Sequence, residues 1–237
     1  IAEGEADLII GTHALLQEQV SMRKLGLAVV DEQHRFGVEQ RGALTQREPR
    51  PHLLAMSATP IPRTLSLTVY GDLDITTLKI LPKGRKSITT TLANSNASEK
   101  SAYELVRQQV ALGRQAFVVC PLIEPSDSIE AASALVEFER LSKGEFKDLR
   151  VGLLHGRMKL PEKQDVMDRV RKGDIDVLVA TPVIEVGVDI PNATVMMIMS
   201  AYRFGLAQLH QLRGRVGRGE DASYCVLMSN SNGAVAN

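Results

Sequence analysis

From residue 87 onward the sequence alternates short apolar runs of four to eight residues with stretches of helical length. Strands that alternate with helices in this way form βαβ units and share a parallel sheet. Helix-end signals agree with this pattern: Ser98 suits an N-cap, Pro161 a first helical turn, and Gly113 and Gly173 suit C-caps. The expected strands are 88–92, 116–123, 151–154, 177–180, 195–199 and 224–228, and the expected helices are 98–112, 129–142, 161–171 and 206–213. The sequence therefore predicts an α/β fold.

The first part of the chain carries the same signals more weakly. We expect strands at 6–10, 27–30, 51–56 and 74–81, one or two helical turns within 14–20, and a helix at 64–70. The run 27–30 shows no polar alternation, which predicts a strand buried on both faces of a sheet covered by helices.

A candidate domain boundary lies at 82–87, where turn-forming residues stand together with three positive charges and no apolar side chain. The alternation of strands and helices begins anew after this segment. We therefore expect two domains, residues 1–84 and residues 85–237, each built on a parallel sheet.

Two carboxylates, Asp31 and Glu32, follow the run 27–30 directly. The carboxyl ends of strands form the ligand-binding edge of an open α/β sheet. At that edge of a nucleoside triphosphatase, one acid holds Mg²⁺ beside the phosphates and a neighbouring acid can orient the attacking water. The alternative is a strand that simply ends in a polar loop.

The stretch 203–219 contains four arginines and no acid. On a helix, its polar residues would share one face and its apolar residues another. The expected polar face is Gln208, Gln211, Arg215 and Arg218, and the expected apolar face is Leu206, Leu209 and Val216. Because two glycines weaken this helix, the last two arginines could instead lie on its fraying end. Guanidinium groups suit the charge of a transferring phosphoryl group, whereas the alternative is a solvated basic surface.

Composition limits the remaining classes of function. The 28 basic and 28 acidic residues leave no net charge, so nucleic acid would have to bind through local patches. Cys120 and Cys225 lie in apolar runs, which predicts buried thiols in a reducing compartment and no metal site. No apolar run approaches the roughly 18 residues of a membrane helix, and no signal peptide is visible, so we expect a cytoplasmic protein without a membrane partner.

Four ordered motifs resemble those of superfamily-2 helicases, and most closely the RecG family of ATP-dependent DNA helicases. They are the strings DEQHRFGVEQR from Asp31, SATPIPRTL from Ser57, PVIEVGVDIPNATVM from Pro182 and RFGLAQLHQLRGRVGRG from Arg203. Translocases that couple transcription to repair, whose partner is RNA polymerase, share ATPIPRTL and RFG and are the nearest alternative. The resemblance implies two RecA-like lobes, of which the first is incomplete at its N-terminus.

For the first lobe, the resemblance implies a nucleotide half-site. Asp31 would hold the Mg²⁺ of ATP and Glu32 would orient the attacking water. The residues implied to couple hydrolysis to the interdomain hinge are Gln33, His34, Ser57 and Thr59, and those implied to contact the DNA backbone are Gly11, Thr12 and His13.

For the second lobe, the resemblance implies two arginine fingers, Arg215 and Arg218, with Gln211 as their partner. Gly187 and Asp189 would sense nucleotide between the lobes. The residues implied to contact DNA are His155, Gly156, Arg157 and Thr181.

The expected function is that of an ATP-dependent helicase that remodels branched or duplex DNA, with ATP and Mg²⁺ as cofactors and no obligate protein partner evident. The chain begins with Ile1 and lacks a phosphate loop of the form GxxxxGK[ST], so we expect a fragment of a longer protein that has no appreciable ATPase activity alone. The rival class is a non-catalytic module that binds nucleic acid or protein on the same fold.

Overall fold

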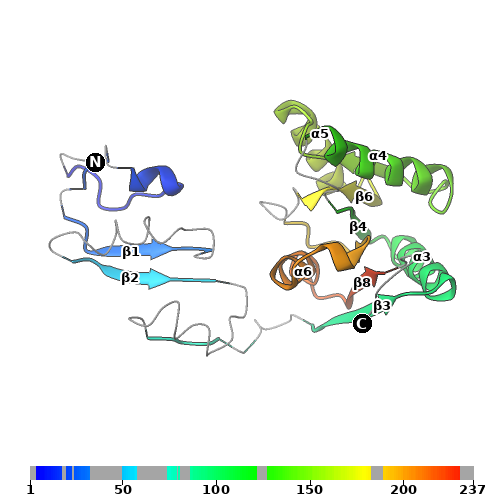
Figure 1. Cartoon of the computed structure of the whole chain (residues 1–237), viewed down its shortest axis with the longest axis horizontal. Coiled ribbons are helices and arrows are strands. Elements are labelled where there is room, and N and C mark those ends of the chain that lie inside the picture. The colour runs from blue at the N-terminus through cyan, green and yellow to red at the C-terminus, as the bar shows by residue number, and fades with distance from the viewer. Residues whose placement is uncertain are drawn as a thin grey trace. The chain divides into compact units, whose positions relative to one another are not determined.

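The structure is a computed structural model of the chain. It describes residues 4–17, 20–22, 24–32, 50–57, 74–78, 80, 86–121, 127–182 and 189–229. The chain divides into two compact units, Ile1–Leu73 and Asp74–Asn237 (Figure 1). The boundary expected after residue 84 falls in a stretch, 81–85, that lies outside the described residues, and its position stays a prediction.

The second unit is a parallel α/β sheet, as the alternating pattern predicted. Six strands lie in the order β3-β8-β7-β4-β6-β5, and every neighbouring pair is parallel. The strands are β3 (Ile88–Ala93), β4 (Gln115–Val119), β5 (Val151–Leu154), β6 (Val177–Ala180), β7 (Ala193–Ile198) and β8 (Ser223–Met228). The helices are α3 (Asn96–Ala111), α4 (Asp127–Lys143), α5 (Leu160–Lys172) and α6 (Leu206–Arg213), with a short 3-10 turn η4 (Ala201–Arg203).

Helices cover both faces of this sheet. The central strands β4, β6 and β7 are buried along their whole length, as expected for a sheet enclosed on two sides. One buried cluster contains residues of α3 and α4, and the other contains residues of α5 and α6. Successive β4 residues alternate between the clusters: Ala116 and Val118 join the first, Phe117 and Val119 the second.

Several helix and strand ends differ from those predicted by one to four residues, and two of these differences have a clear local cause. The N-cap of α3 is Ser95, whose side chain accepts from the Ser98 N–H at 3.3 Å, while Ser98 occupies the third helical position and closes a reciprocal capping box. The strand expected at 116–123 ends at Val119, because Pro121 has no N–H with which to continue the ladder. By contrast, Gly173 caps α5 with φ 77°, as predicted.

The first unit contains a two-stranded parallel sheet, β1 (Leu27–Val30) and β2 (His52–Ala55), and a 3-10 turn, η1 (His13–Leu16). Ala28 and Val30 of β1 are buried, whereas Leu27 is 57% and Val29 54% exposed. The expectation that both faces are buried is therefore wrong for this chain: the side chains that cover β1 in the described part of the unit, such as Leu16, lie against one face only.

Two expected strands are absent from the described residues. Residues 7–10 and 74–78 have no ladder partner there, and Leu8, Ile10 and Leu78 are exposed. An extended segment becomes a strand only when a neighbour satisfies its N–H and C=O groups. The helix expected at 64–70 lies outside the described residues. No helix in the described ranges has the length and apolar character needed to cross a membrane.

Candidate functional site

The acidic pair stands at the carboxyl end of β1. Glu32 adopts a left-handed backbone with φ 50°, its N–H donates to Asp31 Oδ1 at 2.8 Å, and its Oε2 is buried. A left-handed conformation costs a residue with a side chain about 1–2 kcal/mol, and such strain concentrates at functional sites. The turn therefore holds the two carboxylates in fixed, different surroundings, with Asp31 exposed.

Ser57 belongs to the same edge of the sheet. The Met56 N–H donates to the Val30 carbonyl at 2.8 Å, which continues the β1–β2 pairing up to the residues that precede Asp31 and Ser57. The structure thus brings the acidic pair and Ser57 to one edge. The other predicted coupling residues, Gln33, His34 and Thr59, lie outside the described residues.

Asp31 fits the chemistry of a magnesium ligand. Mg²⁺ takes oxygen ligands, keeps several waters, and usually binds protein through one or two carboxylates. An exposed carboxylate at a sheet edge meets that requirement. Among the residues described, no three His, Cys, Asp or Glu side chains converge as a ready-made metal site.

Gly11 and Thr12 directly precede η1. Thr12 is its N-cap, and its Oγ1 accepts from the Ala14 N–H at 3.4 Å. A Cβ on Gly11 would lie 2.8 Å from Leu15 Cδ1, so this position requires glycine or a shift of the leucine. Thr12 therefore has a structural role here, and contact of Gly11, Thr12 and His13 with DNA stays a prediction.

The arginine-rich segment follows α6 instead of extending it. The helix ends at Arg213 with Gly214 as its C-cap, and the Arg215 N–H donates to the Leu212 carbonyl at 3.0 Å in the turn that follows. The prediction of one continuous polar helix face is therefore wrong beyond Arg213. The alternative is confirmed: Arg215 and Arg218 lie past the end of the helix. Leu206 is 85% exposed and is not part of an apolar face.

Arg218 contacts another predicted site residue, Asp189. Its Nη1 donates to Asp189 Oδ1 at 3.1 Å, and its Nε donates to the Gly214 carbonyl at 3.4 Å. Two residues from separate sequence motifs are thus in direct contact. Gly187 lies outside the described residues.

Burial shifts the pKa of two titratable side chains in or near α6. Burial lowers the pKa of His210, and the positive charge of Arg213 lowers it further, which favours the neutral imidazole. Burial raises the pKa of Cys225 to about 11, so its thiol stays protonated. Both cysteines are free and buried, as predicted. The chemistry available in this region is therefore that of the guanidinium groups.

His155 and Thr181 are neighbours at the carboxyl edge of the second sheet. Leu154 pairs with Ala180 at the ends of β5 and β6, and the Thr181 N–H donates to the Leu154 carbonyl at 3.2 Å. His155 Nδ1 and Thr181 Oγ1 are both buried without a hydrogen-bond partner among the described residues. Buried polar atoms are normally paired, so these two mark a place suited to an incoming ligand.

Two lysines that the sequence reasoning did not single out, Lys159 and Lys163, lie close in sequence to the predicted contacts Gly156 and Arg157. Lys163 of α5 donates to the Gly156 carbonyl, and Lys159 is the N-cap residue of the same helix. With exposed Arg157, they place three cations within seven residues. The basic residues are visible in the string HGRMKLPEK, residues 155–163, but their spacing does not match a motif that would have marked the two lysines as site residues. The edge is suited to a phosphate group.

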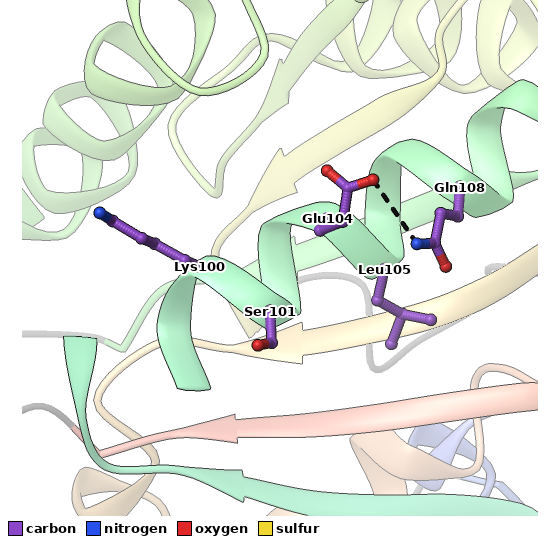
Figure 2. Close-up of a pocket in the computed structure, with 5 residues that line it drawn as sticks. All are labelled: Lys100, Ser101, Glu104, Leu105 and Gln108. Carbon is purple, nitrogen blue, oxygen red and sulfur yellow. Dashed lines mark hydrogen bonds between the residues drawn. The ribbon is translucent and has the colours of Figure 1, made fainter. Parts of the chain in front are cut away.

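Two surface pockets of the second unit are lined by none of the predicted site residues. One, of about 500 Å³, is lined by residues of α3 alone. Gln108 Nε2 donates to Glu104 Oε1 there at 3.5 Å, the bond drawn in Figure 2. The other, of about 400 Å³, lies where β4 and β7 end, with Cys120 and Arg203 among its lining residues.

Comparison with known proteins identifies two family models in sequence order. The model for the DEAD/DEAH box helicase matches residues 1–68, and the model for the helicase conserved C-terminal domain matches residues 99–220, about half of the chain. Both the compact-unit boundary and the predicted domain boundary fall in the interval between the two matches.

The similar full-length proteins are much longer than this chain. The ATP-dependent DNA helicase RecG of Thermotoga maritima is 51% identical over 228 residues, which is 96% of this chain and 29% of the relative. RecG of a Synechocystis species is 49% identical over 98% of this chain and 28% of the relative.

Solved structures agree with these relatives. A structure of RecG bound to a three-way DNA junction matches with a TM-score of 0.68 and 47% identity, over 94% of this chain and 28% of that one. The L327V variant of yeast Dbp5 bound to RNA and ADP BeF3 matches with a TM-score of 0.59 at 18% identity, over 93% of this chain and 57% of that one, a likeness of fold alone. The chain therefore belongs to the family of the helicase conserved C-terminal domain, as a RecG-like superfamily-2 segment with a two-lobe RecA-like fold.

Proposed function

We propose that this chain is part of an ATP-dependent DNA helicase that remodels branched DNA in repair and recombination. The similarity to a RecG structure bound to a three-way junction, at 47% identity over 94% of the chain, carries this proposal. Branched or duplex DNA and ATP are the proposed partners, without an obligate protein partner, and the proposed location is the cytoplasm.

In the proposed nucleotide half-site of the first unit, Asp31 holds Mg²⁺ and Glu32 orients the attacking water. The metal, when bound, neutralises charge on the polyphosphate. The fixed turn between the two acids supports this division of roles, since the Asp31 carboxylate is exposed while Glu32 Oε2 is buried. Ser57 on the same edge, with Gln33, His34 and Thr59, is proposed to couple hydrolysis to movement of the lobes.

In the second unit, Arg215 and Arg218 are proposed to stabilise the charge of the transferring phosphoryl group, with Gln211 as their partner. An arginine finger contributes about 10³–10⁵ in rate. Gly187 and Asp189 are proposed to respond to the nucleotide. ATP would draw the two lobes together because both bind one polyphosphate, and hydrolysis would release them.

The proposed DNA contacts of the second unit lie at the β5–β6 edge. Thr181 Oγ1 and His155 Nδ1 supply buried polar atoms there, while Arg157 and Lys163 supply positive charge. Contacts of this kind bind phosphates and position the protein without reading base sequence. The segment Gly11 to His13 is proposed to make the matching contact from the first lobe.

The test uses the full-length product of the gene that encodes this chain. Purified protein should hydrolyse ATP when branched DNA is added, and Glu32→Gln should abolish hydrolysis while nucleotide binding stays within about twofold of wild type. Undiminished turnover by Glu32→Gln would reject the assignment of Glu32. Absence of DNA-stimulated hydrolysis in the wild type would reject the proposed function and favour a non-catalytic binding module.

A further inference from the structure

The ion pair between Arg218 and Asp189 leaves one guanidinium nitrogen for a ligand. Arg218 bonds to Asp189 through Nη1 and to the Gly214 carbonyl through Nε, and neither bond uses Nη2. The side chain of Arg218 is 31% exposed and that of Asp189 67%. The head group is therefore oriented from two sides while it still reaches solvent.

The backbone on both sides of this pair is held in place. Val216 is fully buried, and Gly217 has φ 71°, with a Cβ there lying 3.0 Å from Ile88 Cγ1. A Cβ on Gly219 would lie 2.8 Å from the carbonyl oxygen of Pro191, two residues after Asp189. The turn that carries Arg218 thus packs directly against the segment that carries Asp189.

We infer that Asp189 is a positioning residue, which orients the Arg218 guanidinium so that Nη2 faces the transferring phosphoryl group. This inference rests on the proposed function of Arg218. An exposed ion pair changes an equilibrium by no more than about fivefold, so its contribution to folding is small. Orientation is a larger effect, because catalytic groups must keep a productive geometry to within about 0.5 Å.

A carboxylate beside an arginine finger could instead bind the nucleotide directly. In that case, removal of Asp189 would weaken ATP binding whether or not Arg218 were present. A positioning role predicts the opposite, since Asp189 would act only through the guanidinium. The two cases differ in which kinetic constant changes and in whether the two substitutions are additive.

The experiment is a double-mutant cycle in the full-length gene product, with kcat and KM for ATP measured at saturating branched DNA. Asp189→Ala should lower kcat at least tenfold with KM within about twofold of wild type. Asp189→Asn, which keeps the accepting oxygen, should recover most of the loss. Arg218→Ala should lower kcat about 10³-fold or more, and Asp189→Ala should add less than twofold in that background.

Two controls make the result decisive. Asp174→Ala removes another exposed acid of the same unit and should leave kcat unchanged. Thermal unfolding should show that each variant folds. If Asp189→Ala raises KM, or if its effect persists in the Arg218→Ala background, the positioning role is wrong although the helicase assignment stands. If the wild-type protein lacks ATPase activity, both the positioning role and the helicase assignment are wrong.

Discussion

The amide of Gln115 joins the start of β4 to helix α5 and to the segments that precede β6 and β7, and its removal should destabilise the unit. The side chain is 5% exposed at the start of β4. Its Nε2 donates to the carbonyls of Val170 and Ile175, each at 2.7 Å, and its Oε1 accepts from Asn192 Nδ2 at 3.3 Å. Gln115→Met keeps the approximate volume and removes all three bonds.

The decrease in the free energy of unfolding that Gln115→Met should cause depends on the hydrogen bonds that each partner of Gln115 loses. The Val170 carbonyl also accepts from the Gly173 N–H at 3.0 Å and keeps that donor, whereas the Ile175 carbonyl loses the amide. Asn192 Nδ2 keeps its bond to the Gly113 carbonyl at 3.0 Å, so the loss of its 3.3 Å bond to Gln115 adds little. The two lost hydrogen bonds of Gln115 Nε2 contribute about 2 kcal/mol, and one stranded buried carbonyl adds about 1 kcal/mol. The free energy of unfolding should therefore fall by about 3 kcal/mol, which lowers Tm by roughly 6–12 °C for a unit of this size.

The assay is thermal and urea unfolding of the 237-residue chain, followed by circular dichroism. The matched control is Gln108→Met on α3, whose exposed amide makes a 3.5 Å bond to Glu104 (Figure 2). That control should stay within about 0.5 kcal/mol of wild type. A Gln115→Met variant as stable as the control would refute the claim that buried amide bonds hold this edge together.

Three further predictions concern other parts of the second unit. Gly217→Ala should lower the free energy of unfolding by about 1–2 kcal/mol in a urea titration, because φ is 71° there and Ile88 is close; an unchanged midpoint would contradict this. Burial raises the Cys225 pKa from 9.0 to about 11, so stability should fall as pH rises from 9 to 11, with a shallower decline in Cys225→Val. Arg157→Ala and Lys163→Ala should each reduce the salt dependence of DNA binding by the full-length protein by about one phosphate contact, whereas unchanged slopes would place the DNA elsewhere.

Periodicity predicted the second unit well because its elements are local patterns. The helix at 206–213 has the predicted bounds, and so do the strands at 151–154 and 177–180. The cap of α3 was placed wrongly because Ser95 and Ser98 are both good capping residues, and only the structure shows that they bond to each other.

Contacts between residues far apart in the sequence could not be predicted from local periodicity. Arg218 and Asp189 are 29 positions apart, and no local pattern pairs them. The adjacency of His155 and Thr181 depends on the strand order, in which β5 lies beside β6. The exposed face of β1 was missed because an unbroken apolar run shows that a strand can be buried on two sides, not that both sides are covered.

The pairing of β3 with β8 has a consequence for synthesis on the ribosome. Ile88 pairs with Ser223, so the first strand of the unit cannot form its ladder until the last strand has been translated. At about 5–20 residues per second this delay is on the order of ten seconds. During that time β3 has no hydrogen-bonding neighbour from its own sheet, and its three consecutive threonines, Thr89 to Thr91, make it a polar strand that resists premature association. A polypeptide released before β8 would leave β3 and β7 without the neighbour that β8 provides to both, and should be a target for chaperones and proteases.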